Sequence, residues 1–464
     1  VAQGEEEGKS FYCGEEALRV WCVQRPDGAQ YVLQRPMRRG RLDLRGRTRE
    51  EALNDLQRVW EHALLNVLQI PPKELPLYAC VLVVPANACK ADIKSLVTLV
   101  LGRLALRSCA VMQDAACAAF GANAVTACVV DIGEGKTSVS VVEEGSCIAC
   151  SCHLLGFGGE DIGRLLLWLL QRGGTSSTAS KPGASMGAGE HADGVAKLVL
   201  GDLDPREPAH VEAFKAFKER ACYVLSAQED LAAATHELSL HRLYGPSTLH
   251  RVRLGAAACI APMGLFNPKL FGPLDWSAAE RKPWGDAEEV VDEEFIVEML
   301  QNRPGGGVSP HDDKLVLREE HLLPESGAAP AALHEVVRDA IARAANLHPN
   351  TKPEGEKLKE GAKDVSKREE VLSKLYANVI LCGASAHIKG LAEAMETRLN
   401  KTKPAGVQHA SVLVNPKDRH SASLAWSGAC IVANVECYKE IFVRQEEWHA
   451  RGVQVLRERV CFPW

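Results

Sequence analysis

The sequence predicts a layered α/β protein, and three of its features indicate this class. Short apolar runs rich in β-branched residues, such as 379–382, are typical of strands buried on both faces. Amphipathic segments lie between such runs, and the order strand, helix, strand, helix, hairpin indicates helices packed on a sheet. The chain has 464 residues, 46% apolar and 25% charged, which suffices for two or more globular domains.

The individual elements follow from apolar spacing and from the residues that end them. Residues 52–68 place their leucines on one helix face, and Pro71 and Pro72 end this helix. We expect short strands in CGEEALRV, AQYVLQRP and RGRLDL within 11–44, strands at 78–84, 110–113, 236–242, 249–254 and 379–382, and helices at 52–68, 91–106, 115–120, 161–171, 193–200, 208–227, 293–302, 331–347, 388–399, 423–435 and 443–450.

Three stretches differ in composition from the rest of the chain. Residues 173–194 are rich in Gly, Ser, Thr and Ala, residues 273–330 in Pro, Gly and acids, and residues 348–367 are charged and of low complexity. We expect a flexible linker or loop in the first stretch and surface insertions in the other two.

The stretch VTACVVDIGEGKTSVSVVEEG, residues 125–145, predicts a hairpin whose turn carries chemically useful groups. Gly133 and Gly135 lie in the turn, and Asp131 ends the first strand. Glycines let backbone N–H groups approach an anion, and an acid beside them can hold a cation or a water. One interpretation is therefore a phosphate-binding loop; the other is an ordinary hairpin in which these residues only form the turn.

A second glycine-rich turn, GFGGED at 156–161, leads into a helix. Asp161 stands where the dinucleotide fingerprint requires its third glycine, so that fingerprint is incomplete. Backbone amides at a helix start can nevertheless hold phosphate.

The net charge of −6 gives no global attraction to nucleic acid, so any such contact must be local. Residues 35–49 contain seven arginines and a single acid, Asp43. The arginines are Arg35, Arg38, Arg39, Arg41, Arg45, Arg47 and Arg49. Their density suits contacts with DNA phosphate, and a solvated charged loop is the alternative interpretation.

Sixteen cysteines at scattered spacings indicate reduced, buried thiols and an intracellular compartment rather than a disulfide framework. Cys147, Cys150, Cys152 and His153 lie close together, but no second ligand pair follows at finger-like distance, so zinc is the minor hypothesis. No apolar run reaches membrane-spanning length, and we expect no membrane association.

Taken together, the motifs resemble the actin family over nearly the whole chain. CGEEA, RRGRLDL and VWEHALLNVL followed by PPKELPLYACVLVVP resemble the family's small-domain signature, and VVDIGEGKTSV resembles its second phosphate loop. LGFGGEDIGRLL is similar to the loop and helix that follow, and LAWSGACIV to the return into the small domain. The resemblance implies an actin-like ATPase fold, with two ribonuclease-H-like α/β domains around a nucleotide cleft. It implies a small domain at 11–120, a large domain at 121–422 that carries the insertions, and a C-terminal return at 423–464.

The resemblance also implies a nucleotide site, with ATP as ligand and Asp131 as an indirect contact to Mg²⁺. Gln113, in VMQDAACAAFGA, matches the glutamine near the attacking water. Lys218 and Glu219, in FKERACYV, match the pair that flanks base and ribose. The adenosine loop is matched within KLYANVILCGAS. The complete implied set is Gln113, Asp131, Gly133, Glu134, Gly135, Thr137, Gly158, Gly159, Lys218, Glu219, Gly383, Ala384 and Ser385.

Departures from the family pattern argue against efficient hydrolysis. Ser138 stands where actins place a histidine that helps to position the attacking water, and a serine cannot replace it without weakening that role. Glu134 replaces an aspartate, and Ala384 replaces the second glycine of the adenosine loop. No strand–loop–strand precedes CGEEA, so we expect the first phosphate hairpin to be absent from this chain. Asp131 and Gln113 remain, which leaves nucleotide and Mg²⁺ binding open.

Three further segments, APMGLFNPKLFG, VNPKDRHSASLAWSGA and RQEEWHARGVQVLRERVCFPW, resemble a nuclear branch of the family that serves in INO-eighty chromatin remodellers. This implies a non-catalytic scaffold that assembles with actin and actin-related protein 4 on a helical segment of the motor subunit and contacts linker or nucleosomal DNA. Residues 35–49 and the insertions are the expected contact regions. The alternative is an ATP-hydrolysing member of the wider superfamily, such as a polymerising actin, a chaperone or a sugar kinase.

Overall fold

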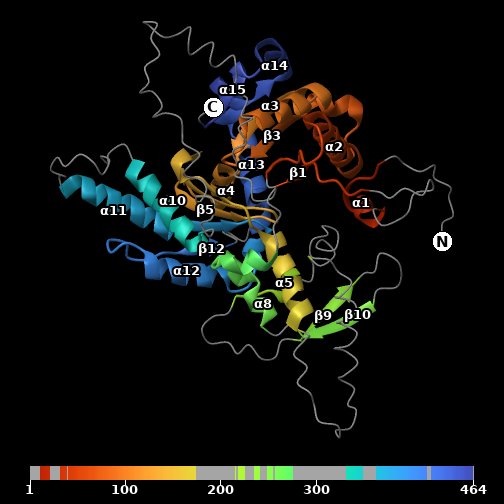
Figure 1. Ribbon diagram of the computed structural model, residues 1–464. Coiled ribbons are helices and arrows are strands. Elements are labelled where there is room, and N and C mark those ends of the chain that lie inside the picture. The colour runs from red at the N-terminus through yellow and green to blue at the C-terminus, as the bar shows by residue number, and fades with distance from the viewer. Residues whose placement is uncertain are drawn as a thin grey trace.

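A computed structural model shows how the predicted elements are arranged (Figure 1). It describes residues 11–20, 32–38, 40–173, 215, 218–224, 235–240, 248–253, 256–274, 331–347, 362–414, 420–462 and 464. The expected helices at 193–200 and 293–302, most of the helix at 208–227 and most of the three insertions lie outside these residues. Of AQYVLQRP, residues 29–31 lie outside them, and of the third insertion, residues 362–367 are described and helical.

The larger sheet has six strands and contains the predicted hairpin. Its order is β12 (Val412–Val414), β11 (Val379–Cys382), β5 (Ala127–Ile132), β6 (Thr137–Glu143) and β7 (Ser146–Cys147), and β8 (His153–Leu155) also pairs with β6. β11 is parallel to β5, whereas β5 and β6 form the antiparallel hairpin. The carboxyl ends of β5 and β11 therefore meet at one edge, where Cys382 lies beside Asp131.

Alternation along β5 sends its side chains into two separate cores. Cys128, Val130 and Ile132 face a core shared with α10 (Leu333–Leu347) and α12 (Leu391–Thr402). Ala127 and Val129 face the opposite side, against α4 (Asp114–Ala122). α11 (Ala362–Ala377) lies with α10 and α12 in Figure 1. The sheet is covered on both faces, as its apolar strands predict.

The smaller sheet has the order β13 (Val443–Arg444), β4 (Ser108–Gln113) and β3 (Ala79–Val84), with β3 and β4 parallel. A core that includes Val97, Val111 and Leu456 joins it to the helices gathered around it in Figure 1. These helices are α2 (Arg49–Glu61), α3 (Lys90–Thr98), α14 (Gln445–Arg451) and α15 (Gln454–Arg459). Met112 belongs to another core, which also contains Val432 of α13 (Leu424–Asn434).

Helices α4 and α13 join the two sheets through a very close backbone contact. A Cβ atom at Gly428 would lie 1.7 Å from the carbonyl oxygen of Cys117, and one at Gly121 would lie 2.2 Å from that of Leu424. Neither position has room for a side chain, so the glycines are required by the packing of the two helices.

Two small hairpins complete the described strands. β1 (Met37–Arg38) pairs with β2 (Arg41–Leu42) inside the arginine-rich stretch. β9 (Thr235–Leu240) pairs with β10 (Thr248–Arg253), which confirms the two strands expected there.

Most of the described expectations are confirmed with shifted ends, but two expected strands are corrections. Residues 32–36 of AQYVLQRP form no strand, and Pro36 has no N–H to donate to a neighbouring strand. The segment CGEEALRV is the second correction. It forms α1 (Gly14–Val20) instead of a strand, because Glu, Ala, Leu and Arg favour helix over strand. The strands at 78–84, 110–113 and 379–382 are β3, β4 and β11, and the helices at 115–120, 161–171, 331–347, 388–399, 423–435 and 443–450 are α4, α5 (Gly159–Gly173), α10, α12, α13 and α14.

The expected helix at 52–68 begins earlier and changes its winding. Thr48 and Glu51 form a capping box, in which the Glu51 amide donates to Thr48 Oγ1 at 3.2 Å and the Thr48 amide donates to the Glu51 carboxylate at 2.8 Å. After Glu61 the chain continues as a wider π-helical turn, His62–Val67. The helix expected at 91–106 also changes from α-helical to π-helical winding: it consists of α3 followed by the π-helical turn Leu99–Arg103.

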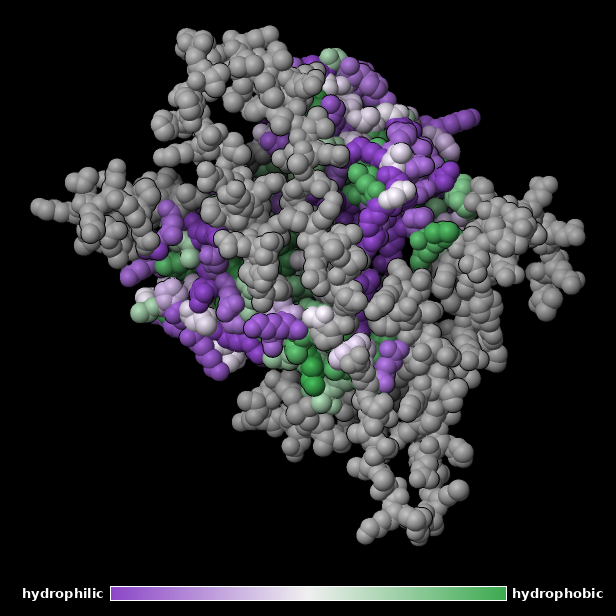
Figure 2. Space-filling view, in the orientation of Figure 1, coloured by the Kyte–Doolittle hydropathy of each residue, from purple (hydrophilic) through white to green (hydrophobic). Residues whose placement is uncertain are grey.

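Polar residues cover most of the described surface visible in Figure 2, and apolar residues form small separate groups there. Across the described ranges, no helix combines the length and the apolar character needed to cross a bilayer.

Candidate functional site

The predicted phosphate hairpin contacts the start of α5 first through backbone groups. The Gly159 amide donates to the Gly133 carbonyl oxygen at 2.9 Å, and the Glu160 amide donates to the Glu134 carbonyl oxygen at 2.7 Å. A Cβ atom at Gly158 would lie 2.6 Å from the Gly133 oxygen. Gly158 is therefore explained by the packing of one loop on the other.

Two side chains stabilise this arrangement. Thr137 is fully buried, and its Oγ1 donates to the Phe157 carbonyl oxygen at 2.8 Å, which joins the hairpin to the loop before α5. Asp161 accepts a hydrogen bond from the Gly158 amide at 2.8 Å, which holds that loop against the start of α5.

Lys218 joins the hairpin to the start of α5 from a third direction. This side chain is only 4% exposed, and its Nζ donates to both carboxylate oxygens of Glu134 at 3.0 Å and to the Gly159 carbonyl oxygen at 2.8 Å. A Cβ atom at Gly159 would lie 2.4 Å from Ser385 Oγ. Four of the predicted site residues thus meet at one point: Glu134, Gly159, Lys218 and Ser385.

Gly383 follows β11 and brings the adenosine-loop segment against the hairpin. Its φ is +86°, a conformation that favours glycine, and a Cβ atom there would lie 2.5 Å from Asp131 Oδ1. Ser385 is buried in the turn that follows, whereas Ala384 is exposed. The sheet topology explains this meeting, because β5 and β11 are parallel and end at the same edge.

Asp131 lies in a charged cluster with two residues that the family resemblance did not include. The pKa of Asp131 is raised from 3.8 to about 6, first by burial and then by the Asp114 carboxylate, while the positive charge of Lys136 lowers it. Lys136 Nζ lies 3.2 Å from Asp114 Oδ2. The sequence signal for this pair was a lysine in the hairpin turn and an acid at the first position of α4.

The hairpin tip offers backbone donors to an anion. Within the described part of the chain, no hydrogen bond engages the amides of Glu134, Gly135 and Lys136, and all three residues are half-buried. Successive amides beside an ammonium group suit a phosphate. The residues present at the tip therefore fit the phosphate end of a nucleotide.

Two predicted residues do not join this cluster. Gln113 is buried at the end of β4, where its Nε2 donates to the Ala86 carbonyl oxygen at 2.9 Å. Glu219 is exposed beside Lys218.

An imidazole pair that the sequence did not suggest lies next to the adenosine-loop segment: His387 Nε2 and His420 Nδ1 are 3.2 Å apart. Burial and the neighbouring His420 lower the pKa of His387.

Three arginines of the arginine-rich stretch form ion pairs within the protein. These are Arg45 with Asp43 at 2.9 Å, Arg47 with Asp55 at 2.7 Å and Arg49 with Asp92 at 2.5 Å. Asp92 is buried, so its arginine stabilises the fold. Arg38 and Arg41 face each other across the β1–β2 hairpin, and Arg39 lies outside the described residues.

The Cys/His segment at 147–153 has internal partners. His153 Nε2 lies 3.0 Å from Asp339 Oδ2, and its Nδ1 lies 2.9 Å from the Ser151 carbonyl oxygen. Among the residues that the structure describes, no three metal-binding side chains come together.

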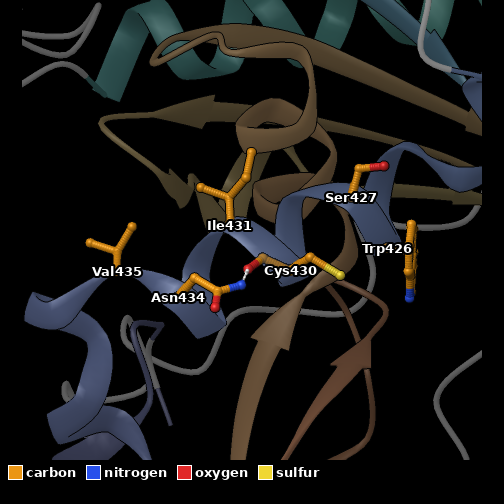
Figure 3. A pocket seen from close by; sticks show the side chains of 6 residues that line it. All are labelled: Trp426, Ser427, Cys430, Ile431, Asn434 and Val435. Atoms are coloured by element: carbon orange, nitrogen blue, oxygen red, sulfur yellow. Dashed lines mark hydrogen bonds between the residues drawn. The ribbon is translucent and has the colours of Figure 1, made fainter.

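A groove on the outer face of α13 is a separate feature. Figure 3 shows the six residues that line its cavity of about 510 Å³: Trp426, Ser427, Cys430, Ile431, Asn434 and Val435. Trp426 is 69% exposed, and Ile431 and Val435 are also exposed. Sequence reasoning missed this groove because Trp426 has the spacing of an ordinary helix residue.

The chain matches the actin family, described as Actin, over residues 4–345 and 361–461. It belongs to the actin family, and the expected actin fold is confirmed. The chain is 27% identical over 490 residues to actin-related protein 8 of Bos taurus and 28% identical over 497 residues to that of Danio rerio. Each alignment covers 98% of this chain and 74% of the relative.

The fold is also similar to a solved structure described as human actin-related protein Arp8 in its ATP-bound state. The TM-score is 0.68 at 24% identity, and the match covers 92% of this chain and 70% of that chain. The domain boundaries, the absence of the first phosphate hairpin and the nucleotide-binding set stay predictions.

The raised pKa of Asp131 predicts a specific pH dependence of stability. Because the folded pKa of about 6 exceeds the unfolded value, protonation favours the folded state, and the free energy of unfolding declines as pH rises from about 4 to about 6. Asp131→Asn should remove this decline and raise the free energy of unfolding at pH 7.5 by roughly 2 kcal/mol, with little change at pH 4. Urea unfolding at both pH values measures the difference; parallel pH profiles would contradict it.

Proposed function

We propose that this chain is a non-catalytic, actin-related scaffold subunit of a nuclear, ATP-dependent chromatin-remodelling complex of the INO-eighty class. The observation that carries the proposal is the similarity to actin-related protein 8 along 98% of the chain. In this role the chain assembles with actin and actin-related protein 4 on a helical segment of the motor subunit. It also contributes to binding of linker or nucleosomal DNA.

The geometry of the site supports binding of nucleotide without hydrolysis. Ser138 pairs directly across the hairpin from Asp131 and is buried, so no imidazole occupies this position. The Gln113 amide group donates to a backbone carbonyl of its own domain. A hydrolytic site needs a group that orients the attacking water, and these two positions do not supply one. Bound ATP would then stabilise the contact between the loops as a structural ligand.

Single-turnover hydrolysis decides between this scaffold and the ATP-hydrolysing alternative. With the full chain in excess over labelled ATP, we expect phosphate release far slower than in a conventional actin control, because the site lacks a water-orienting side chain. Release at the rate of the actin control that is abolished by Asp131→Ala would establish the alternative instead.

The groove on α13 supports the proposed contact with a helical segment. Trp426 and Cys430 are four residues apart on α13, as are Ser427 and Ile431, so each pair consists of neighbouring side chains on the helix surface. An amphipathic helix binds such a partly apolar surface through its own apolar face. The opposite side of α13 is fixed against α4 through Gly428, so the groove stands on a rigid element.

Trp426→Ala should weaken co-purification of the motor-subunit helix with the full chain by about tenfold or more, because exposed tryptophans are frequent interface hot spots. Leu77→Ala is the matched control, since Leu77 is 68% exposed and Trp426 is 69% exposed. The dissociation constant of each variant for the purified helical segment measures the size of the effect. Equal weakening in both variants, or none in Trp426→Ala, would remove the groove from the proposal.

The DNA-binding candidates are the seven arginines of residues 35–49, and three neighbouring members of this set, Arg38, Arg39 and Arg41, are the ones to test first. Charge reversal of Arg38, Arg39 and Arg41 should weaken DNA binding and lower the slope of log K against log salt by roughly 0.9 for each DNA phosphate that is no longer neutralised. Reversal of Lys374, Lys401 and Lys439, which are exposed elsewhere, changes the net charge equally and serves as the control. An unchanged salt slope in the arginine variant would exclude this stretch.

A further inference from the structure

Lys136 is held between the two sheets by contacts on several sides. Its Nζ lies 3.2 Å from Asp114 Oδ2, and the two side chains are only 14% and 15% exposed. Asp114 is itself fixed, because its Oδ1 accepts hydrogen bonds from the Ala86 amide at 3.0 Å and the Ala115 amide at 2.8 Å. The methylene stem of Lys136 lies beside Gly40, where a Cβ atom would be 3.6 Å from Cε. The ammonium group therefore has a defined position.

A second carboxylate, Asp131, lies within electrostatic reach of this pair. Asp114 and Lys136 both act on the pKa of Asp131, in opposite directions. The carboxylates come from different parts of the fold, Asp131 from the end of β5 and Asp114 from the start of α4. Lys136, in the hairpin turn, brings a positive charge to both.

The other lysine at this site is held elsewhere. Lys218 pairs with Glu134 at 3.0 Å and donates to the Gly159 carbonyl oxygen. Lys136 is the lysine that pairs with Asp114 and whose positive charge also acts on Asp131. A divalent cation placed between these carboxylates would lie against an ammonium group in a half-buried site, where like charges repel strongly.

The residues present consequently do not fit the Mg²⁺ that the family resemblance implies. We propose that Lys136 is a built-in cation that takes the place of the divalent metal, so that this chain binds a nucleoside triphosphate without Mg²⁺. The three amides at the hairpin tip, from Glu134 to Lys136, belong to the same turn as this lysine and make no hydrogen bond within the described residues, so they are the groups that would bind the phosphate. The inference rests on the proposed function for nucleotide binding, and it adds that this binding is independent of metal.

The first test is ATP binding to the full chain, measured by calorimetry with excess Mg²⁺ and again with EDTA. The wild-type affinity should differ by less than about threefold between the two conditions, because the counter-charge is part of the protein. Lys136→Met should bind ATP about tenfold more weakly in EDTA, and Mg²⁺ should restore part of the affinity. Lys136→Arg keeps the charge and should keep metal-independent binding. A wild-type chain that needs Mg²⁺, or a Lys136→Met chain unaffected by EDTA, would overturn the inference.

A second test needs no nucleotide and separates the two proposals. Mn²⁺ binding, followed by electron paramagnetic resonance, should be at least about tenfold tighter in Lys136→Met than in wild type, because Asp131 and Asp114 then share a site without an ammonium group. Adding Asp131→Asn to that variant should abolish the increase in affinity. Equal Mn²⁺ binding by wild type and Lys136→Met would refute the built-in cation. Failure of ATP to bind in any buffer would refute the nucleotide proposal, while the Mn²⁺ result would still decide the role of Lys136.

Discussion

The close contact between α4 and α13 is the constraint on which the rest of the structure depends. α4 leads from the smaller sheet into the larger one and covers one face of the latter, while α13 contacts the core behind β4. Gly121 and Gly428 let the two backbones touch, so both helices can belong to both halves of the molecule. Any side chain at either glycine would separate the helices and move Asp114, at the start of α4, away from the hairpin that carries Lys136.

This constraint places three loops at one edge of the larger sheet. The hairpin between β5 and β6, the start of α5 and the turn after β11 meet there because β5 and β11 are parallel neighbours. Their glycines are explained by contacts within the protein: Gly158 lies against the hairpin backbone, and Gly383 lies against Asp131. A glycine-rich loop is therefore not proof of a ligand, and the stronger argument for phosphate comes from the unengaged amides at the hairpin tip.

The larger sheet and most helices could be predicted because their signals are local. An apolar β-branched run gives β5 or β11, and helical spacing gives α10. The site was only partly predictable. The meeting of Lys218 with Glu134, and of Gly159 with Ser385, depends on residues far apart in sequence and on the order of strands, which periodicity does not contain. The strand predicted in CGEEALRV was wrong, because the prediction gave its short apolar pattern more weight than its helix-forming residues. Two ion pairs of the arginine-rich stretch could not be predicted from it, because Asp55 and Asp92, the partners of Arg47 and Arg49, lie outside the stretch.

The distribution of charge at the site connects structure with function. Each lysine has its own acid, Lys136 with Asp114 and Lys218 with Glu134, so the folded site is nearly balanced before any ligand binds. Hydrolysis requires groups that interact more strongly with the transition state than with the bound substrate. Charges already paired with protein partners, a glutamine bonded to Ala86 and a serine opposite Asp131 provide little such difference. They do provide cohesion at the site: Lys136 joins the hairpin to α4, and Lys218 joins it to the start of α5. Such cohesion suits the scaffold role proposed above.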